Sequence, residues 1–188
     1  MREATVDDAD AIARVHVDSW RGAYRGLVPD SVLDGLSVER RAEGWREWLA
    51  PDRATRRNID GLGRIIAAAR TWVAEREDRI VGFVNAGPSR ESDVANCGEV
   101  YAIYVLPEAW DNGVGAALMN AAVSWLRTRY AGAMLWVLAG NDRGRAFYEK
   151  GGWGPDGSVQ KLDFDGIDLD EVRYRIDFGP GRTTGSDV

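Results

Sequence analysis

The fold of this chain is decided by residues 98–130, GEVYAIYVLPEAWDNGVGAALMNAAVSWLRTRY. An apolar strand over residues 99–106 leads into a short loop, and the loop opens an amphipathic helix at Val114. Backbone amides at the start of a helix have no partners within the helix, and the helix dipole adds positive potential there. Gly113 and Gly115 leave room for a ligand to approach the main chain. The stretch therefore predicts an anion-binding site, and phosphate is the usual anion at such a site.

Other phosphate-binding patterns fit this loop poorly. A dinucleotide-binding fingerprint needs a third glycine, and Leu118 stands at that position. A Walker loop needs a Gly-Lys-Ser/Thr sequence, which the loop lacks. A Gly-x-Gly pair by itself is also typical of a tight turn from a strand to a helix. The identity of the ligand therefore has to come from the rest of the chain.

The bulk composition is that of one globular domain. The chain has 188 residues, of which 45% are hydrophobic and 29% are charged. Its net charge of -6 argues against broad nucleic-acid binding, which requires a basic face. No apolar run approaches the roughly 18 residues of a membrane span, and no signal peptide is visible. We therefore expect a cytoplasmic protein that binds no membrane.

Metal and thiol chemistry are not expected. The single cysteine, Cys97, excludes an intrachain disulfide, and the single histidine, His16, is distant from it in the chain. One cysteine and one histidine are a weak basis for a nucleophilic pair, and the sequence contains no cluster of zinc ligands. His16 shares a helical face with Ile12 and Trp20, so we interpret it as a packed histidine rather than a base.

Hydrophobic periodicity predicts an α+β domain in the order β-α-α-β-β-β-α-β-α-β-β, with no internal repeat and no linker. A strand over residues 2–5 precedes a helix capped by Thr5 or Asp7, and glycines and a proline predict a loop or a broken helix over residues 21–29. A second helix is expected over residues 38–49. The remaining elements are a polar break over residues 58–63, a hairpin of residues 71–75 and 80–86, a polar loop over 89–98, a buried strand over 133–139, a helix over 142–150, a hairpin of 161–164 and 172–178, and a polar tail over 179–188.

A second motif, NDRGRAFYEKGGW at residues 141–153, makes the pattern specific. Together with the glycine loop it resembles the signature of the GNAT superfamily of acyl-CoA-dependent N-acyltransferases. That signature joins a phosphate loop, Gln/Arg-x-x-Gly-x-Gly/Ala, to a later segment, Asn-x-x-Ala-x-x-Phe-Tyr-x-x-x-Gly-Phe. The opening residues, ATVDDADAIARVHVDSWRGAYRGLVPD, also resemble the first helices of many members. The later segment of this chain contains Asn141, Ala146, Phe147, Tyr148, Gly152 and Trp153, with tryptophan where phenylalanine is usual and a departure in the spacing after Asn141.

The resemblance covers residues 1–178 and implies a single GNAT-like N-acyltransferase domain, followed by a flexible polar tail over residues 179–188. It implies a mixed, mostly antiparallel sheet with a splayed central strand pair, flanked by helices. It further implies transfer of acetyl from acetyl-CoA to a primary amine by direct attack in a ternary complex, because no residue suits a covalent nucleophile. The expected partner is a small-molecule or peptide amine and not a nucleic acid, and a homodimer is compatible with the family.

The same resemblance assigns the donor site. The backbone near Val105 is expected to pair with the pantetheine arm, and the Val105 amide is expected to face the thioester oxygen, where it would stabilise negative charge. Trp110 stands where the family has Gln or Arg, and Asp111 adds negative charge, so we expect acetyl-CoA binding to be weakened but kept. The predicted donor-site residues are Val105, Asn112, Gly113, Val114, Gly115, Ala116 and Asn141.

Proton transfer is assigned to Glu99 and Tyr148. An amine is cationic at neutral pH, so a base must remove a proton before the amine attacks. Glu99 lies fourteen residues before Gly113, as the base glutamate does in family members that use one, and it would act directly or through a water. Tyr148 matches the family tyrosine that protonates the leaving thiolate. The alternatives are a solvated or salt-bridged glutamate, a core tyrosine, and, for Asn141, a helix cap in place of a contact with the cofactor arm.

The acceptor pocket is defined least by the sequence. The first two helices form one wall of it in this family, and Trp20 and Tyr24 are the predicted substrate-binding residues. Arg25 and the acidic loop residues Glu91 and Asp93 are further candidates, with an ordinary surface position as the alternative for each. Two other functions remain open: an acyl-CoA sensor without turnover, and an interaction module built on the tryptophan-rich N-terminal helices.

Overall fold

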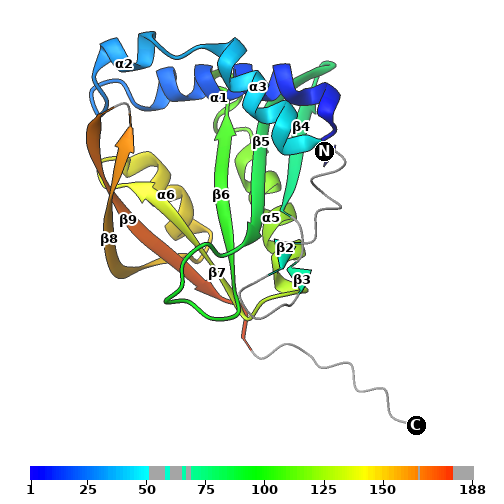
Figure 1. Ribbon diagram of the computed structural model, residues 1–188, viewed down its shortest axis with the longest axis vertical. Coiled ribbons are helices and arrows are strands. Elements are labelled where there is room, and N and C mark those ends of the chain that lie inside the picture. Colours follow the sequence, from blue (N-terminus) through cyan, green and yellow to red (C-terminus); the bar gives the residue numbers. More distant parts are fainter. Residues whose placement is uncertain (51–57, 60–64, 67–68, 165, 180–188) are drawn as a thin grey trace.

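A seven-stranded sheet in the order β1-β4-β5-β6-β7-β9-β8 forms the centre of the computed structural model (Figure 1). The structure describes residues 1–50, 58–59, 65–66, 69–164 and 166–179, so most of the predicted polar break and of the predicted tail lies outside it. The strands are β1 (Arg2–Glu3), β4 (Arg70–Arg76), β5 (Arg79–Pro88), β6 (Cys97–Val105), β7 (Gly132–Leu138), β8 (Gly154–Phe164) and β9 (Ile167–Asp177), with a separate pair of β2 (Asn58–Ile59) and β3 (Ile65–Ile66). The helices are α1 (Ala9–Ala23), α2 (Asp30–Asp34), α3 (Val38–Leu49), α5 (Val114–Arg127) and α6 (Asp142–Lys150), with 3-10 turns η1 (Val6–Asp8) and η2 (Pro107–Ala109).

The main elements follow the order expected from the sequence. α3 and α6 have the predicted bounds: the Ser37 hydroxyl accepts a hydrogen bond from the amide of Arg40 at the start of α3, and Gly151 follows the last residue of α6. The expected hairpin of β4 and β5 is present, and Glu77 and Asp78 form its turn with φ values of 51° and 57°. The C-terminal hairpin of β8 and β9 is confirmed, with longer strands than predicted.

Two local expectations are wrong. α1 does not end before the predicted loop but continues through Gly22 to Ala23. Gly22 serves close packing rather than a break, because a Cβ at this position would lie 2.5 Å from Cγ of Pro107. Residues 58–59, the start of the predicted polar break, instead pair as β2 with β3. The first error shows a tertiary contact that overrides the usual effect of a glycine on a helix.

The central strands β6 and β7 are the only parallel neighbours among the described strands of the large sheet, and they pair over a short length. Beyond these pairs the two strands diverge (Figure 1). β6 keeps β5 as its other partner and β7 keeps β9, so the sheet stays continuous on both sides of the gap. This arrangement confirms the splayed central pair that the family resemblance implied. The paired positions are Cys97 with Gly132, Gly98 with Ala133, and Glu99 with Met134.

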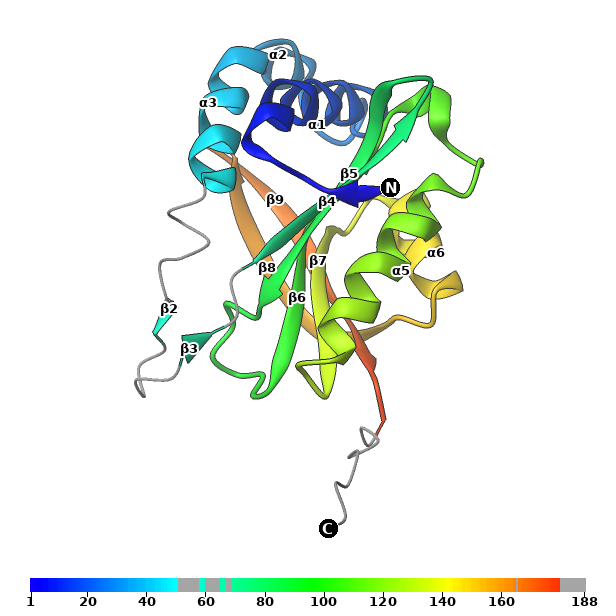
Figure 2. The ribbon, with the colours of Figure 1, turned by 90° about the vertical axis from the view of Figure 1, so that its right-hand side faces the viewer.

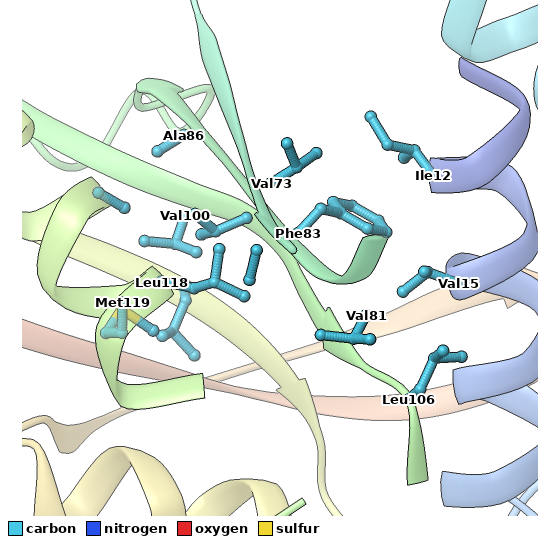
Figure 3. Packing of buried hydrophobic residues seen from close by; sticks show 14 of the residues in the cluster. Ile12, Val15, Val73, Val81, Phe83, Ala86, Val100, Leu106, Leu118 and Met119 are labelled. Carbon is cyan, nitrogen blue, oxygen red and sulfur yellow. The ribbon is translucent and has the colours of Figure 1, made fainter. Parts of the chain in front are cut away.

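Helices cover both faces of the sheet, with α1 and α3 on one face and α5 on the other (Figure 2). On the α1 face, Ile12 and Val15 pack toward Phe83 (Figure 3). On the α5 face, Leu118 packs toward Val100. All five side chains are buried, and burial of a side chain of this size stabilises a fold by about 1.5–3 kcal/mol. The two layers therefore fix β5 and β6, and with them one border of the gap.

Candidate functional site

The gap between β6 and β7 presents main-chain groups of β6. The amide of Leu106 donates to the carbonyl of Val81 at 2.9 Å, so these two residues form a hydrogen-bonded pair of the antiparallel ladder. Such pairs alternate with non-bonded ones, so the amides and carbonyls of Ile103 and Val105 point away from β5 and toward the gap. The Val105 amide therefore faces the place where the sequence predicts a thioester oxygen.

The turn from β6 into α5 depends on Gly113. Gly113 has a φ of 76°, in the left-handed region that favours glycine. The first bond of the helix runs from the amide of Ala117 to the carbonyl of Gly113 at 3.0 Å, so the amides of the preceding residues have no partner in the helix. The first turn of α5, which the structure describes in full, contains no acidic residue. The helix start therefore suits an anion.

A cavity of about 410 Å³ lies along this loop and opens into the gap. We name it the donor cavity, after the acyl donor that the sequence predicts. Of the predicted donor-site residues, Asn112 and Val114 do not line it. The Asn112 side chain is exposed and donates to the carbonyl of Trp110 at 3.0 Å, whereas Val114 packs against the hydrophobic core. The predicted residues that do line the cavity are Val105, Gly113, Gly115, Ala116 and Asn141.

A cation accompanies the two residues that depart from the family pattern. Arg143 of α6 holds its guanidinium 4.3 Å from the centre of the Trp110 ring and 3.0 Å from a carboxylate oxygen of Asp111. Trp110 in turn donates its Nε1–H to the carbonyl of Val105 at 2.7 Å. Arg143 lines the donor cavity, so its charge offsets that of Asp111 beside the predicted phosphate site. Nothing in the local sequence indicates this contact, since 32 residues separate the two side chains.

α6 positions Asn141 and Tyr148. Asn141 caps the helix, because its Oδ1 accepts a hydrogen bond from the amide of Gly144 at 2.9 Å, and it also lines the donor cavity. Tyr148 lies later on the same helix and lines the same cavity. Burial, together with the nearby Tyr104, raises the pKa of Tyr148 above its ordinary value. The hydroxyl of Tyr148 therefore keeps its proton at neutral pH, as a proton donor must.

A second cavity, of about 540 Å³, meets the donor cavity, and we name it the acceptor cavity. Its lining includes the predicted proton-transfer pair, Glu99 and Tyr148. It also includes the predicted substrate-binding pair, Trp20 and Tyr24. The site residues that the sequence placed on separate segments therefore border one space. The residues that line both cavities are Tyr24, Ile103, Tyr104 and Tyr148.

Glu99 is held in place by Arg90. Only 1% of the Glu99 side chain is exposed, and both of its carboxylate oxygens accept hydrogen bonds from Arg90. Oε2 accepts from the backbone amide of Arg90 at 2.9 Å, and Oε1 accepts from Nε at 3.0 Å and from a terminal guanidinium nitrogen. The salt-bridged alternative for Glu99 is thus present, and it fixes the orientation of the carboxylate at the wall of the acceptor cavity.

His16 of α1 also belongs to the wall of the acceptor cavity. Its ring stacks on that of Tyr104 with 4.8 Å between the ring centres. Burial, followed by the charge of Arg41, lowers the pKa of His16 to about 3. The ring is therefore neutral near pH 7, and it packs against Tyr104 as the helical pattern predicts.

The three further acceptor-site candidates take different positions. Glu91 lines the acceptor cavity and accepts a hydrogen bond from Nε1 of Trp136 at 3.2 Å. Arg25 forms ion pairs with two aspartates of α2, and Asp93 forms one with Arg173 at 2.8 Å. Neither Arg25 nor Asp93 lines the donor or the acceptor cavity. Arg25 and Asp93 therefore match the alternative of an ordinary surface position.

Other kinds of site find little support in the described part of the chain. Within it, no helix is long and apolar enough to cross a membrane. Nor do these residues include a group of three His, Cys, Asp or Glu that could hold a metal ion. Burial raises the pKa of the Cys97 thiol above its ordinary value, which disfavours the reactive thiolate. The chemistry of the protein is therefore best sought in the donor and acceptor cavities.

Comparison with known proteins gives one consistent family. Residues 37–153 match the model of the Acetyltransferase (GNAT) family. An uncharacterized N-acetyltransferase of Bacillus subtilis, YuaI, is 31% identical over 143 residues, which cover 75% of this chain and 72% of that protein. A probable N-acetyltransferase of Mycobacterium tuberculosis, Rv2775, is 25% identical over 179 residues, which cover 94% of this chain and 92% of that protein.

Solved structures show the same fold. The PaiA N-acetyltransferase of Thermoplasma acidophilum, crystallised in complex with coenzyme A, has a TM-score of 0.67 at 18% identity and covers 94% of this chain and 97% of that chain. A ribosomal-protein-alanine N-acetyltransferase of Brucella melitensis has a TM-score of 0.65 at 24% identity and covers 94% of this chain and 98% of that chain. At these sequence identities the two solved structures show a shared fold.

Proposed function

Because the chain belongs to the GNAT acetyltransferase family, we propose that it transfers the acetyl group of acetyl-CoA to a primary amine by direct attack within a ternary complex. The observation that carries this proposal is the junction of the donor and acceptor cavities at Tyr148. Direct attack requires the reacting atoms to approach within about 3–3.5 Å of each other. Two cavities that share a wall offer this proximity without transfer of acetyl to a protein side chain.

The donor cavity has the groups that acetyl-CoA needs. Acetyl-CoA supplies a thioester whose carbonyl carbon is open to attack by an amine. The amides at the start of α5 bind the pyrophosphate, and Arg143 adds a cation beside them. The main-chain groups of β6 that face the gap bind the pantetheine arm, and among them the Val105 amide stabilises negative charge on the thioester oxygen. Binding of acetyl-CoA in this proposal therefore depends on main-chain groups of β6. It does not need the Gln or Arg side chain that the family has at the position of Trp110.

Proton transfer in this proposal uses Glu99 and Tyr148, which both line the acceptor cavity. The ammonium gives up one proton before the attack and a second as the amide bond forms. Glu99 receives the first proton, directly or through a water, and passes it to solvent. As the carbon–nitrogen bond forms, the carbon–sulfur bond breaks, and Tyr148 donates its hydroxyl proton to the leaving sulfur. Tyr148 is reprotonated as the nitrogen loses its second proton.

The proposal is tested with the purified full chain, acetyl-CoA and a panel of amines that includes polyamines, amino sugars, aminoglycosides, amino acids and peptides with a free N-terminus. Release of free thiol and the mass of the N-acetyl product report turnover. We expect Glu99→Gln and Tyr148→Phe to lose turnover while a calorimetric titration shows acetyl-CoA binding unchanged. The matched controls are Glu75→Gln and Tyr130→Phe, because neither residue lines the donor or the acceptor cavity.

Two results would replace this proposal with another function. Binding of acetyl-CoA without thiol release for any amine of the panel would favour an acyl-CoA sensor. A stable protein complex that persists after acetyl-CoA is removed, again without turnover, would favour an interaction module.

A further inference from the structure

Some of the charged side chains that line the acceptor cavity have an ion-pair partner and others do not. Arg90 and Glu99 bind each other, and Glu91 accepts a hydrogen bond from the ring of Trp136. The cavity lining also contains the carboxylate of Glu171 and the guanidinium of Arg41. Neither of these last two forms an ion pair with another residue in the described ranges. A cavity that offers one carboxylate and one guanidinium without opposite charges is suited to a ligand that carries both.

Glu171 is the unpaired carboxylate in the lining of the acceptor cavity. It is on β9, opposite Leu138 of β7, and its carboxylate accepts one hydrogen bond, from Nε2 of Gln160 at 2.8 Å. Burial is the main cause that raises the pKa of Tyr24 and of Tyr104, and the charge of Glu171 adds to both effects. These two tyrosines line the donor cavity as well. The charge of Arg41 acts on Tyr104 as well, so both unpaired charges lie near this ring in the wall of the acceptor cavity.

Arg41 is the unpaired guanidinium in the lining of the acceptor cavity. It is on α3, and it also lines an outer cavity of about 540 Å³ under that helix, whose lining does not include Glu171. Its side chain is half-buried and forms no hydrogen bond with any residue that the structure describes. Its charge contributes to the lowered pKa of His16, after the larger effect of burial, so the guanidinium is near the cavity wall. Arg41 therefore lines both the acceptor cavity and the outer cavity.

Aromatic rings also line the acceptor cavity. Trp20 stacks on Phe164 with 4.7 Å between the ring centres, and both rings line the acceptor cavity. Tyr101 and Trp136 line it as well. Rings of this kind offer apolar surface to the body of a ligand and leave its ends to the charged groups. The lining thus combines one unpaired carboxylate, one unpaired guanidinium and several aromatic rings.

We propose that the acceptor is an amine that also carries an anionic group, a carboxylate or a phosphate, with its ammonium at Glu171 and its anionic group at Arg41. This inference rests on the proposed function and names its substrate class. A guanidinium binds the oxygens of either anion with two parallel hydrogen bonds, and such charge-assisted bonds are strong where water is excluded. The ammonium end is thereby held in the cavity that Glu99 and Tyr148 also line.

The inference is tested with four series of acceptors of graded chain length: ω-amino carboxylates, ω-aminoalkyl phosphates, the methyl esters of the carboxylates, and plain alkylamines. We expect kcat/KM for the best anionic acceptor to exceed that of the matched acceptor without the anionic group roughly tenfold or more. The better of the two anionic series identifies the anion. The chain length with the highest kcat/KM reports the distance between the side chains of Glu171 and Arg41.

Variants assign the preference to the two side chains. Arg41→Gln is expected to remove the advantage of the anionic acceptors over the esters. Glu171→Gln is expected to raise KM for all four series alike, because all of them carry the ammonium. The matched control is Arg46→Gln, since Arg46 lies on the same helix, pairs with Asp10 at 2.6 Å and lines none of the three cavities. Circular dichroism and urea denaturation check that each variant is folded.

Calorimetric titration of the same acceptors into the coenzyme A-loaded protein separates this inference from the proposed function. Tighter binding of the anionic acceptors that depends on Arg41 supports the inference even if no amine is acetylated. Turnover of esters and alkylamines at the rates of the anionic acceptors overturns it and leaves the acetyltransferase proposal intact. Equal binding of all four series in the absence of turnover overturns it too, as does an equal effect of Arg41→Gln on acceptors with and without the anionic group.

Discussion

Arg90 binds the buried carboxylate of Glu99 through its guanidinium and also through its own backbone amide. The same guanidinium lies 4.6 Å from the centre of the Tyr101 ring. The contact ties the loop that follows β5 to β6, and both side chains of the ion pair line the acceptor cavity. In the proposed reaction Glu99 therefore meets the amine in an orientation that Arg90 sets.

Arg90→Ala is expected to destabilise the protein by about 1–3 kcal/mol. Loss of one partner of a buried pair is costly, but 66% of the Arg90 side chain is exposed, and exposure to water reduces the effect. Urea denaturation measures the change, with Arg76→Ala as the control because Arg76 and its ion-pair partner Glu77 are both exposed. Equal free energies of unfolding for the two variants would contradict the account of Arg90.

Tyr148→Phe is expected to lower kcat roughly 100-fold and to leave the affinity for acetyl-CoA unchanged, because the variant keeps the ring and loses the proton donor. Burial raises the pKa of Tyr148, so the wild-type enzyme should lose no activity through ionisation of this residue up to about pH 10. Steady-state rates across pH 7 to about 10 measure both effects. A decline of kcat that begins near pH 8 in the wild type and is missing from the variant would assign an ordinary or lowered pKa to Tyr148 and contradict its role.

Arg143→Ala is expected to raise KM for acetyl-CoA roughly tenfold, because the variant leaves the charge of Asp111 uncompensated beside the phosphate site. The double variant Arg143→Ala with Asp111→Asn should recover part of the affinity. Initial rates with varied acetyl-CoA measure both values. S-acetyl-pantetheine, which has no pyrophosphate, provides the control: its KM should be the same in the wild type and in Arg143→Ala. An equal rise of KM for both donors would place the effect of Arg143 elsewhere.

His16→Phe is expected to make the protein less sensitive to acid. The folded-state pKa of His16, about 3, lies below its ordinary value of 6.5, so between these pH values the unfolded chain binds a proton that the folded chain does not. Wild-type stability therefore rises with pH in this window and falls on acidification. Between pH 7 and pH 5 the wild type should lose roughly 2 kcal/mol more than His16→Phe.

Urea denaturation of both proteins at the two pH values measures this difference. His16 is the single histidine of the chain, so no other imidazole contributes to it. The same loss of stability in both proteins would mean that His16 is protonated in the folded state and would contradict its burial against Tyr104.

Elements with local punctuation were predictable from the sequence. Ser37 marks the start of α3, Gly113 the turn into α5, and Gly151 the end of α6. The end of α1 was not predictable, because Gly22 acts through its contact with Pro107, far away in the chain. The splay of β6 and β7 has no periodic signal either, and it was inferred from the family resemblance.

The residues of the candidate site also include some that the sequence predicted and some that it did not. Motif residues such as Glu99 and Tyr148 were found because their spacing from the glycine loop and within the second motif is recognisable. Arg143, Arg41 and Glu171 were missed because each reaches the site from a separate element, and no motif marks any of them. Charged residues on a helix or an edge hairpin look like surface residues until the fold places them around a cavity.

Direct transfer within a ternary complex is tested most directly by initial rates in which acetyl-CoA and an acceptor amine are both varied. The account predicts double-reciprocal plots whose lines intersect, because both substrates must be bound in the joined cavities before acetyl moves. Parallel lines, together with an increase of the protein's mass after incubation with acetyl-CoA alone, would show that acetyl passes through a protein side chain and would contradict the account.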